Sequence, residues 1–259
     1  MKICVLGSGS KGNCTLVQSG GTTLLIDAGF SGIEIKRRLA LIGLGLESVT
    51  AILVTHEHND HICGVGVLSR RGRLPVHANP ATHRAAEKKT GMLFSRCDFD
   101  TGEKFSIGNL QIHPFAVSHD TADPVGYVLS DGTSNVGYCT DTGKVTALME
   151  HHLKCCDILI LESNHDPKML REGPYPLYLQ QRVRSNRGHL ANEDAGRLLQ
   201  KIAGGRLRYA VLAHLSEINN MPSLAVQAAV NHLGELAPCI EIIPASQQNP
   251  SQVIHISGR

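Results

Sequence analysis

Short apolar runs separated by polar turns fill the first half of the chain, whereas apolar runs alternate with amphipathic stretches in the second half. Apolar runs of about four to eight residues are typical of buried strands, and apolar residues that recur every three or four positions predict helices. Predicted strands cover residues 2–6, 14–19, 23–27, 51–55, 75–78, 125–130, 135–140, 157–162, 209–213, 239–243 and 252–256, with a turn and a strand in 104–117. Predicted helices cover residues 31–42, 80–90, 145–153, 190–203 and 223–233. No repeat or linker divides the chain, so we expect a single domain over residues 1–259, in which two sheets are flanked by helices.

Several predicted strands end in one polar residue of a kind that suits acid–base or metal chemistry. These residues are Asp27, His56, His119, Asp141, Glu162 and His214. A single residue of this kind is usually a turn or capping residue, but turns alone do not account for six of them. Side chains at strand ends on one edge of a sandwich converge, so we expect a shared cleft there.

The run His56-Glu57-His58-Asn59-Asp60-His61 contains four potential metal ligands within six residues. Imidazole nitrogen and carboxylate oxygen bind zinc and other first-row divalent ions. His56 and His58 lie two positions apart, so on an extended chain they point the same way. The adjacent Asp60 and His61 contact the same ion only if the loop coils tightly. We therefore predict a loop that serves two ions side by side, and the alternative is a solvated polar loop.

Composition narrows the classes of protein that this chain can form. Of its 259 residues, 42% are hydrophobic and 19% are charged, which allows a large core and argues against disorder. The formal net charge of +2 excludes a strongly basic protein, so nucleic-acid binding would require a local patch. The 14 histidines favour metal or acid–base chemistry.

The cysteines and the N-terminal segment bear on the compartment. The eight cysteines form no CxxC pair, which argues against a structural zinc knuckle. The first residues lack the apolar region of a signal peptide, and no stretch approaches the length of a membrane span. We therefore expect a cytoplasmic protein with reduced cysteines and no membrane partner; the oligomeric state stays open.

The order and spacing of these residues resemble the metallo-β-lactamase fold superfamily over nearly the whole chain. The pattern is His56-x-His58-x-Asp60-His61, followed by His119, Asp141 and His214. Four further motifs resemble the YycJ/WalJ-like branch, which is related to the RNase Z and RNase J nucleases: Ser8-Gly9-Ser10-Lys11-Gly12-Asn13, Leu161-Glu162-Ser163-Asn164-His165-Asp166, Gly188-His189-Leu190-Ala191-Asn192 and Leu212 to Asn220. The resemblance implies an α/β (α+β) fold, a four-layer αββα sandwich with its site at one edge.

The resemblance also implies the roles of the ligand residues. His56, His58 and His119 would hold one divalent ion, Asp60, His61 and His214 would hold a second, and Asp141 would bridge the two. Asp27 would orient the ligand segment, because ligand imidazoles need a partner for their second ring nitrogen. Mixed nitrogen and oxygen ligands accept Zn²⁺ or Mn²⁺. Two such ions would lower the pKa of a shared water enough to give a hydroxide nucleophile.

A proton donor for the leaving group is the other part of the implied chemistry. His189 resembles the histidine that RNase Z-like enzymes place there with an upstream glutamate, which would be Glu162. With the ligand Asp60, these are the predicted catalytic residues, and a positioned acid contributes roughly 10²–10⁴-fold. A helix-start histidine and an ordinary strand-end carboxylate are the alternatives for His189 and Glu162. His165 is left between lining the cleft and forming a turn.

Three features favour a phosphodiester substrate. β-Lactamases lack the aspartate that Asp141 would supply as the bridging ligand. Arginine and tyrosine side chains that suit phosphates and bases are interleaved just before His189: Arg171, Tyr175, Tyr178, Arg182, Arg184 and Arg187. The basic runs 36–38 and 70–73 are further candidates to flank the cleft, and the glycine-rich turn 8–13 is a weak candidate to present backbone N–H groups to a phosphate.

The leading hypothesis is a metal-dependent phosphodiesterase acting on DNA, and by resemblance an exonuclease directed to the 5′ end. An RNA-processing nuclease and a glyoxalase II-like thioester hydrolase are alternatives with the same ligands. A non-catalytic binding protein that retains the fold is a third, and the complete ligand set argues against it. Only 73 positions separate Asp141 from His214, so the extra domain that RNase J-like enzymes insert there is not expected.

Overall fold

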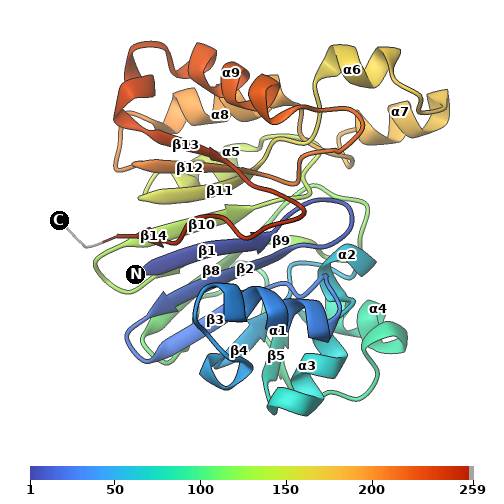
Figure 1. Cartoon of the computed structure of the whole chain (residues 1–259), viewed down its shortest axis with the longest axis vertical. Helices are drawn as coiled ribbons and strands as arrows, with labels where there is room; N and C mark the ends of the chain where they lie inside the picture. Colours follow the sequence, from blue (N-terminus) through green and yellow to red (C-terminus); the bar gives the residue numbers. More distant parts are fainter. Residues whose placement is uncertain (257–259) are drawn as a thin grey trace.

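Two seven-stranded sheets pack face to face, and helices cover the outer face of each sheet (Figure 1). The computed structural model describes residues 1–256. The arrangement is the predicted four-layer αββα sandwich of the α/β class, so the fold prediction is confirmed.

The first sheet is antiparallel in one half and parallel in the other. Its order is β14 (Ile254–His255), β1 (Lys2–Gly7), β2 (Cys14–Ser19), β3 (Thr22–Ile26), β4 (Ala51–Leu53), β5 (Pro75–Ala78) and β6 (Ser95–Asp98). Strands from β14 to β3 pair antiparallel, and strands from β3 to β6 pair parallel.

The second sheet has the same division. Its order is β13 (Glu241–Pro244), β12 (Tyr209–Ala213), β11 (Ile158–Glu162), β10 (Asn135–Cys139), β9 (Val125–Ser130), β8 (Leu110–Ala116) and β7 (Phe105–Ile107). Strands from β13 to β10 pair parallel, and strands from β10 to β7 pair antiparallel. The carboxyl ends of parallel strands meet at one edge of a sheet, which is where α/β proteins bind ligands.

The helices form the two outer layers and one projection. The helices beside the first sheet are α1 (Gly32–Leu41), α2 (Asn59–Ile62), α3 (Val65–Gly72) and α4 (Pro80–Thr90), and those over the second sheet are α5 (Ala147–Leu153), α8 (Asn192–Ile202) and α9 (Pro222–Leu233). The short helices α6 (Pro167–Glu172) and α7 (Leu177–Val183) project at one end of the second helical layer (Figure 1). Among residues 1–256, no helix has the length and apolar character to cross a membrane.

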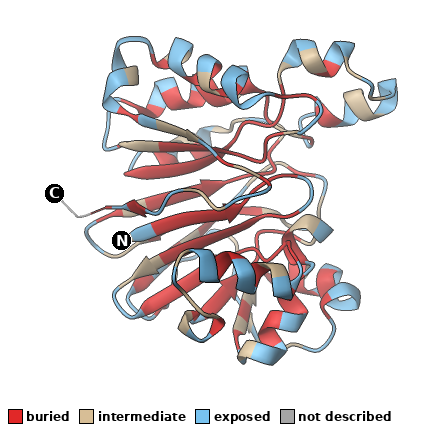
Figure 2. Ribbon diagram, in the orientation of Figure 1, coloured by how far each residue is buried: buried red, intermediate tan, exposed pale blue. Residues whose placement is uncertain are grey.

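Three apolar layers hold the sandwich together. One lies between the sheets and includes Ile26, Tyr127 and Val211. The other two lie between each sheet and its helices, so central strands such as β3 and β11 are buried on both faces (Figure 2). This two-sided burial explains why these strands appear in the sequence as continuous apolar runs, whereas β6 and β8 alternate between less and more exposed residues.

The sequence prediction missed four α-helices and two strands. Glycine is typical of turns, but Gly66 lies inside α3, where a Cβ atom would stand 1.9 Å from the Thr90 carbonyl oxygen. Glycine is there for close helix packing rather than for a turn. The polar segment 163–188 contains α6 and α7, which are too short to show a periodic pattern. The others missed are α2, β6 and β7, the last because only one strand was predicted in 104–117.

Candidate metal centre

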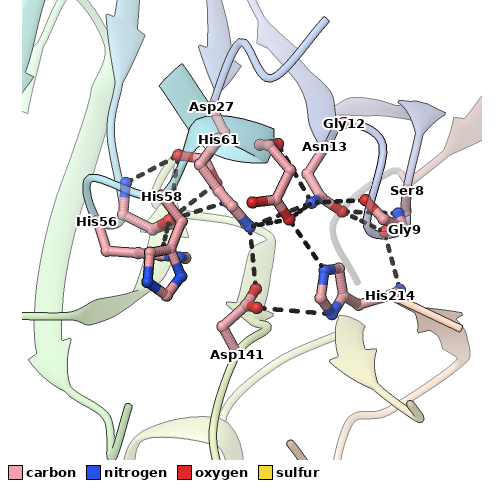
Figure 3. A network of polar contacts seen from close by, with 12 residues as sticks. Ser8, Gly9, Gly12, Asn13, Asp27, His56, His58, His61, Asp141 and His214 are labelled. Carbon is pink, nitrogen blue, oxygen red and sulfur yellow. Dashed lines mark hydrogen bonds and ion pairs between the residues drawn. The ribbon is translucent and has the colours of Figure 1, made fainter. Parts of the chain in front are cut away.

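Ligand-type side chains from both sheets meet at the edge where the parallel strands end (Figure 3). His56 follows β4, His119 follows β8, Asp141 follows β10 and His214 follows β12. Candidate ligand atoms lie within 4.8 Å of one another in four overlapping sets: His56, His58 and His119; Asp60, His61 and His214; His56, His61 and Asp141; and Asp141, Glu162, His189 and His214. The structure therefore brings all seven predicted ligands into one cluster.

The segment after His56 is the predicted loop only as far as His58. From Asn59 it coils into α2, and the His61 N–H donates to the His58 carbonyl at 3.0 Å. This coil brings the ring centroids of His56 and His61 to 4.0 Å. The adjacent Asp60 and His61 therefore both face the cluster, which the spacing argument had allowed only for a tightly coiled chain.

Three functional candidates have left-handed backbone conformations. Asp27, Asp141 and His214 have φ of 60°, 56° and 55°, and the one other described non-glycine residue with positive φ is Arg73. Such conformations cost of order 1–3 kcal/mol each and persist where the surrounding structure imposes them. Each of the three lies just after a strand; Asp141 and His214 belong to the cluster, and Asp27 faces His61 beside it.

The donors present fit divalent cations. His56 Nε2 is buried and has no hydrogen-bond partner among the described residues. A buried nitrogen without a partner lowers the stability of a protein by about 1–3 kcal/mol. Burial by itself would raise the pKa of the Asp60 carboxyl. The neighbouring His61 and His214 together have the larger, opposite effect and hold that pKa far below its usual range. Burial also opposes charge on His214, yet Asp141, Asp60 and Glu162 raise its pKa to about 10. Carboxylates that stay charged and raise the pKa of a neighbouring imidazole give the site a negative potential. Such a potential attracts cations.

Asp27 holds the segment 55–61, which carries four of the candidate ligands, through hydrogen bonds from Thr55 and His61. One carboxylate oxygen accepts the Thr55 N–H at 2.8 Å, and the other accepts His61 Nδ1–H at 2.8 Å and the Thr55 hydroxyl at 2.9 Å. The carboxylate is fully buried. These contacts turn His61 Nε2 toward the cluster, where it lies 3.1 Å from an Asp141 oxygen.

Glu162 lies beneath two histidines of the site. Its Oε1 accepts from Nδ1 of His189 at 2.7 Å and from Nδ1 of His214 at 3.0 Å. Its Oε2 accepts the N–H groups of Thr142 at 2.8 Å and Leu190 at 3.1 Å. Burial favours protonation of Glu162, but His189 outweighs it and holds the pKa at about 2. Burial opposes charge on His189, whose pKa is nevertheless raised because Glu162 and Asp141 are close.

An open cavity of about 440 Å³ lies over the cluster, and it includes two of the six predicted nucleic-acid contacts. Tyr175 and Arg182 line it. Within residues 1–256, the other four do not line this cavity: Arg171, Tyr178, Arg184 and Arg187. Arg187 instead donates to the His119 carbonyl at 3.1 Å, and Arg171 pairs with Glu172 on the surface. Lys89, in the last turn of α4, also lines the cavity, and nothing in its local sequence distinguished it from the neighbouring Lys88.

Two other sequence ideas need correction. The backbone N–H groups of Ser8, Gly9, Lys11, Gly12 and Asn13 all donate to protein acceptors, so the turn 8–13 does not present a set of N–H groups to a phosphate. Arg38 belongs to no surface patch, because its buried guanidinium donates to the Leu6 and Gln247 carbonyls. His165 is also buried, and it lies in an isolated bridge to Ala191 rather than in the cavity lining.

Comparison with known proteins identifies relatives of the whole chain. Residues 22–215 match the family described as the Beta-lactamase superfamily domain. The chain is 36% identical over 258 residues to the exodeoxyribonuclease YycJ of Bacillus anthracis, covering 97% of this chain and 98% of that protein. It is 39% identical over 238 residues to the exodeoxyribonuclease WalJ of Streptococcus pneumoniae, covering 90% and 88%.

A solved structure agrees on the fold. The metallo-β-lactamase fold protein YhfI of Bacillus subtilis superposes with a TM-score of 0.75 at 20% identity, covering 97% of this chain and 99% of that one. The resemblance predicted from the motifs is thus confirmed. This chain belongs to the β-lactamase superfamily, as a metal-dependent hydrolase similar to YycJ and WalJ.

Proposed function

We propose that this protein is a dinuclear metal-dependent phosphodiesterase that degrades DNA from its ends, starting at the 5′ end. The observation that carries the proposal is the meeting of two ligand sets around Asp141 at the floor of an open cavity. The full-length similarity to two proteins named exodeoxyribonucleases supports DNA as the substrate. Free thiols at all eight cysteines suit the cytoplasm, where we propose that it acts.

In this proposal His56, His58 and His119 hold one Zn²⁺ or Mn²⁺ ion, and Asp60, His61 and His214 hold the other, with Asp141 shared between them. Bound ions of this kind supply an activated water and offset the charge of a phosphoryl oxygen. Asp27 keeps His61 in its ligating tautomer, because its carboxylate only accepts and so requires the hydrogen on Nδ1.

His189 supplies the proton for the leaving oxygen. Its Nδ1 is held by Glu162 at 2.7 Å, and its side chain lines the cavity. The Nε2–H is therefore the donor available to a bound substrate. Glu162 keeps the imidazole oriented and stabilises its protonated form, as a carboxylate does for a general acid–base histidine.

The walls of the cavity suit a nucleic-acid strand. Lys89 on one helix and Arg182 on another offer cations to backbone phosphates, and Tyr175 offers a ring on which a base can stack. Arg182 donates to Asp120 at 2.9 Å, which holds its guanidinium in place. A phosphate would bind this guanidinium in exchange for the contact with Asp120.

End-labelled substrates test the proposal. Protein loaded with Zn²⁺ or Mn²⁺ is incubated with duplex DNA, single-stranded DNA and RNA, each labelled at the 5′ or the 3′ end, and with a thioester. We expect DNA labelled at its 5′ end to release labelled mononucleotide first. The variant Asp141→Asn is the matched control and should lose nearly all activity. Intact DNA beside cleaved RNA or cleaved thioester would overturn the proposal.

A further inference from the structure

The turn between β1 and β2, residues 8–13, links ligands of the two sheets (Figure 3). The Ser8 hydroxyl accepts the backbone N–H of His214 at 2.8 Å and donates to Asn13 Oδ1 at 2.8 Å. The backbone N–H of Asn13 donates to the Asp60 carbonyl at 2.8 Å. Ser8 and Asn13 are both buried. A ligand of the second sheet is thus connected to the α2 ligands through two buried side chains.

Chemistry fixes which way the Asn13 amide faces. Its Oδ1 also lies 2.9 Å from the Gly9 N–H, which only donates, so the oxygen belongs on that side. The amide nitrogen therefore faces the ligands. It lies 3.1 Å from His61 Nε2 and 3.4 Å from the Asp60 carboxylate, with the Gly9 and Asp60 carbonyls at 3.1 and 3.3 Å.

His61 Nε2 accepts from Asn13 when the imidazole is neutral. An amide nitrogen cannot accept, and His61 Nδ1 donates to Asp27, so the neutral ring presents the lone pair of Nε2 to Asn13, whereas a protonated ring donates from Nε2 to Asp141, 3.1 Å away. The same lone pair would bind a metal ion, and the amide would then keep the Asp60 carboxylate and carbonyl as its acceptors. Asn13 thus has a partner on the ligand segment whether or not His61 is engaged.

We infer that Asn13 is a positioning residue for the half of the centre formed by Asp60, His61 and His214, and that Ser8 extends this control to His214. The inference rests on the metal centre proposed above. Loss of a residue that orients a metal ligand typically costs 10–100-fold in affinity. Within residues 1–256, the amide forms no hydrogen bond to His56, His58 or His119, so this subset should keep its affinity.

The experiment is a Zn²⁺ titration of metal-free protein in competition with a chromophoric chelator. Asn13→Ala should weaken one of the two binding steps by 10–100-fold and leave the other unchanged. Ser8→Ala should weaken the same step less, because the amide remains. Lys11→Ala is the control, since its side chain lies on the same turn but pairs with Glu217 on the surface.

A second measurement separates positioning from packing. Unfolding temperatures are compared with and without a fixed concentration of Zn²⁺. A tenfold weaker site reduces the stabilisation by Zn²⁺ by about 1.4 kcal/mol, whereas a loss of packing alone lowers both temperatures equally. An Asn13→Ala protein that binds Zn²⁺ like the wild type, or loses only metal-free stability, would overturn the inference. A wild-type chain that takes up no Zn²⁺ would overturn the centre itself.

Discussion

Replacing Glu162 with glutamine tests the support of the site most directly. The carboxylate uses all four of its acceptor positions, two for imidazole N–H groups and two for backbone N–H groups. Glutamine has the same shape but carries one NH₂ group, which must face one of these two pairs of donors. Two of the four hydrogen bonds are therefore either lost or reversed in direction, and the negative charge beside His189 disappears.

The two orientations have different consequences. If the NH₂ group faces the backbone of Thr142 and Leu190, two buried N–H groups lose their acceptor and stability falls. If it faces the imidazoles, it donates to their Nδ1 atoms, which moves the hydrogen of His214 to the nitrogen that should bind metal. Breaking a buried charged contact of this kind costs about 3–5 kcal/mol, and losing a positioned acid costs roughly 10²–10⁴-fold in rate.

The assay combines urea unfolding of metal-free protein, a Zn²⁺ titration, and kcat on end-labelled DNA. We expect Glu162→Gln to lose several kcal/mol of stability or at least tenfold in Zn²⁺ affinity, and at least 100-fold in kcat. Glu172→Gln on α6 is the matched control, because that carboxylate is exposed and pairs only with Arg171 in the described contacts. A Glu162→Gln enzyme whose stability is within about 1 kcal/mol of the wild type and whose kcat is within about threefold of it would refute this reasoning.

Three further predictions follow from separate features. Gly29→Ala should destabilise the protein by about 2 kcal/mol or more, because its Cβ would stand 1.7 Å from the Asp60 carbonyl oxygen; Gly21→Ala, with nothing within 4 Å, is the control in thermal unfolding. Burial lowers the pKa of His165 from 6.5 to about 4, so the unfolded chain binds a proton before the folded one as pH falls. Stability should thus drop by up to about 3 kcal/mol between pH 6.5 and 4, and His165→Gln should lose that part of the slope in urea titrations at several pH values. Arg182→Ala should weaken DNA binding and reduce the slope of log K against log salt by about one phosphate contact, whereas an Arg184→Ala protein with the same effect would count against a specific role for the cavity wall.

The features that could be predicted from the sequence are those encoded locally. A buried parallel strand must be apolar on both faces, so its polar end is conspicuous, and this pattern identified Asp141 and His214 before their neighbours were known. Arg38 shows the opposite case. It lies in a basic run on an amphipathic helix, yet its guanidinium is buried against the Phe30 ring and donates to a carbonyl 209 positions away. No local pattern reports such a contact.

The choice of ligating nitrogen shows why the centre depends on the whole fold. His61, His119 and His214 each have Nδ1 bonded to a distant acceptor, which lies 34, 69 and 52 positions away in the chain. Each Nε2 is thereby left for the cluster. His58 is reversed, since its Nδ1 lies 3.2 Å from His119 Nε2 inside the cluster, while its Nε2 faces Asp120 at 3.8 Å. The hexapeptide thus supplies four of the candidate ligands, but the orientations of His61, His119 and His214 are imposed by acceptors from distant parts of the chain. A transplanted hexapeptide would therefore lack the geometry that this site requires.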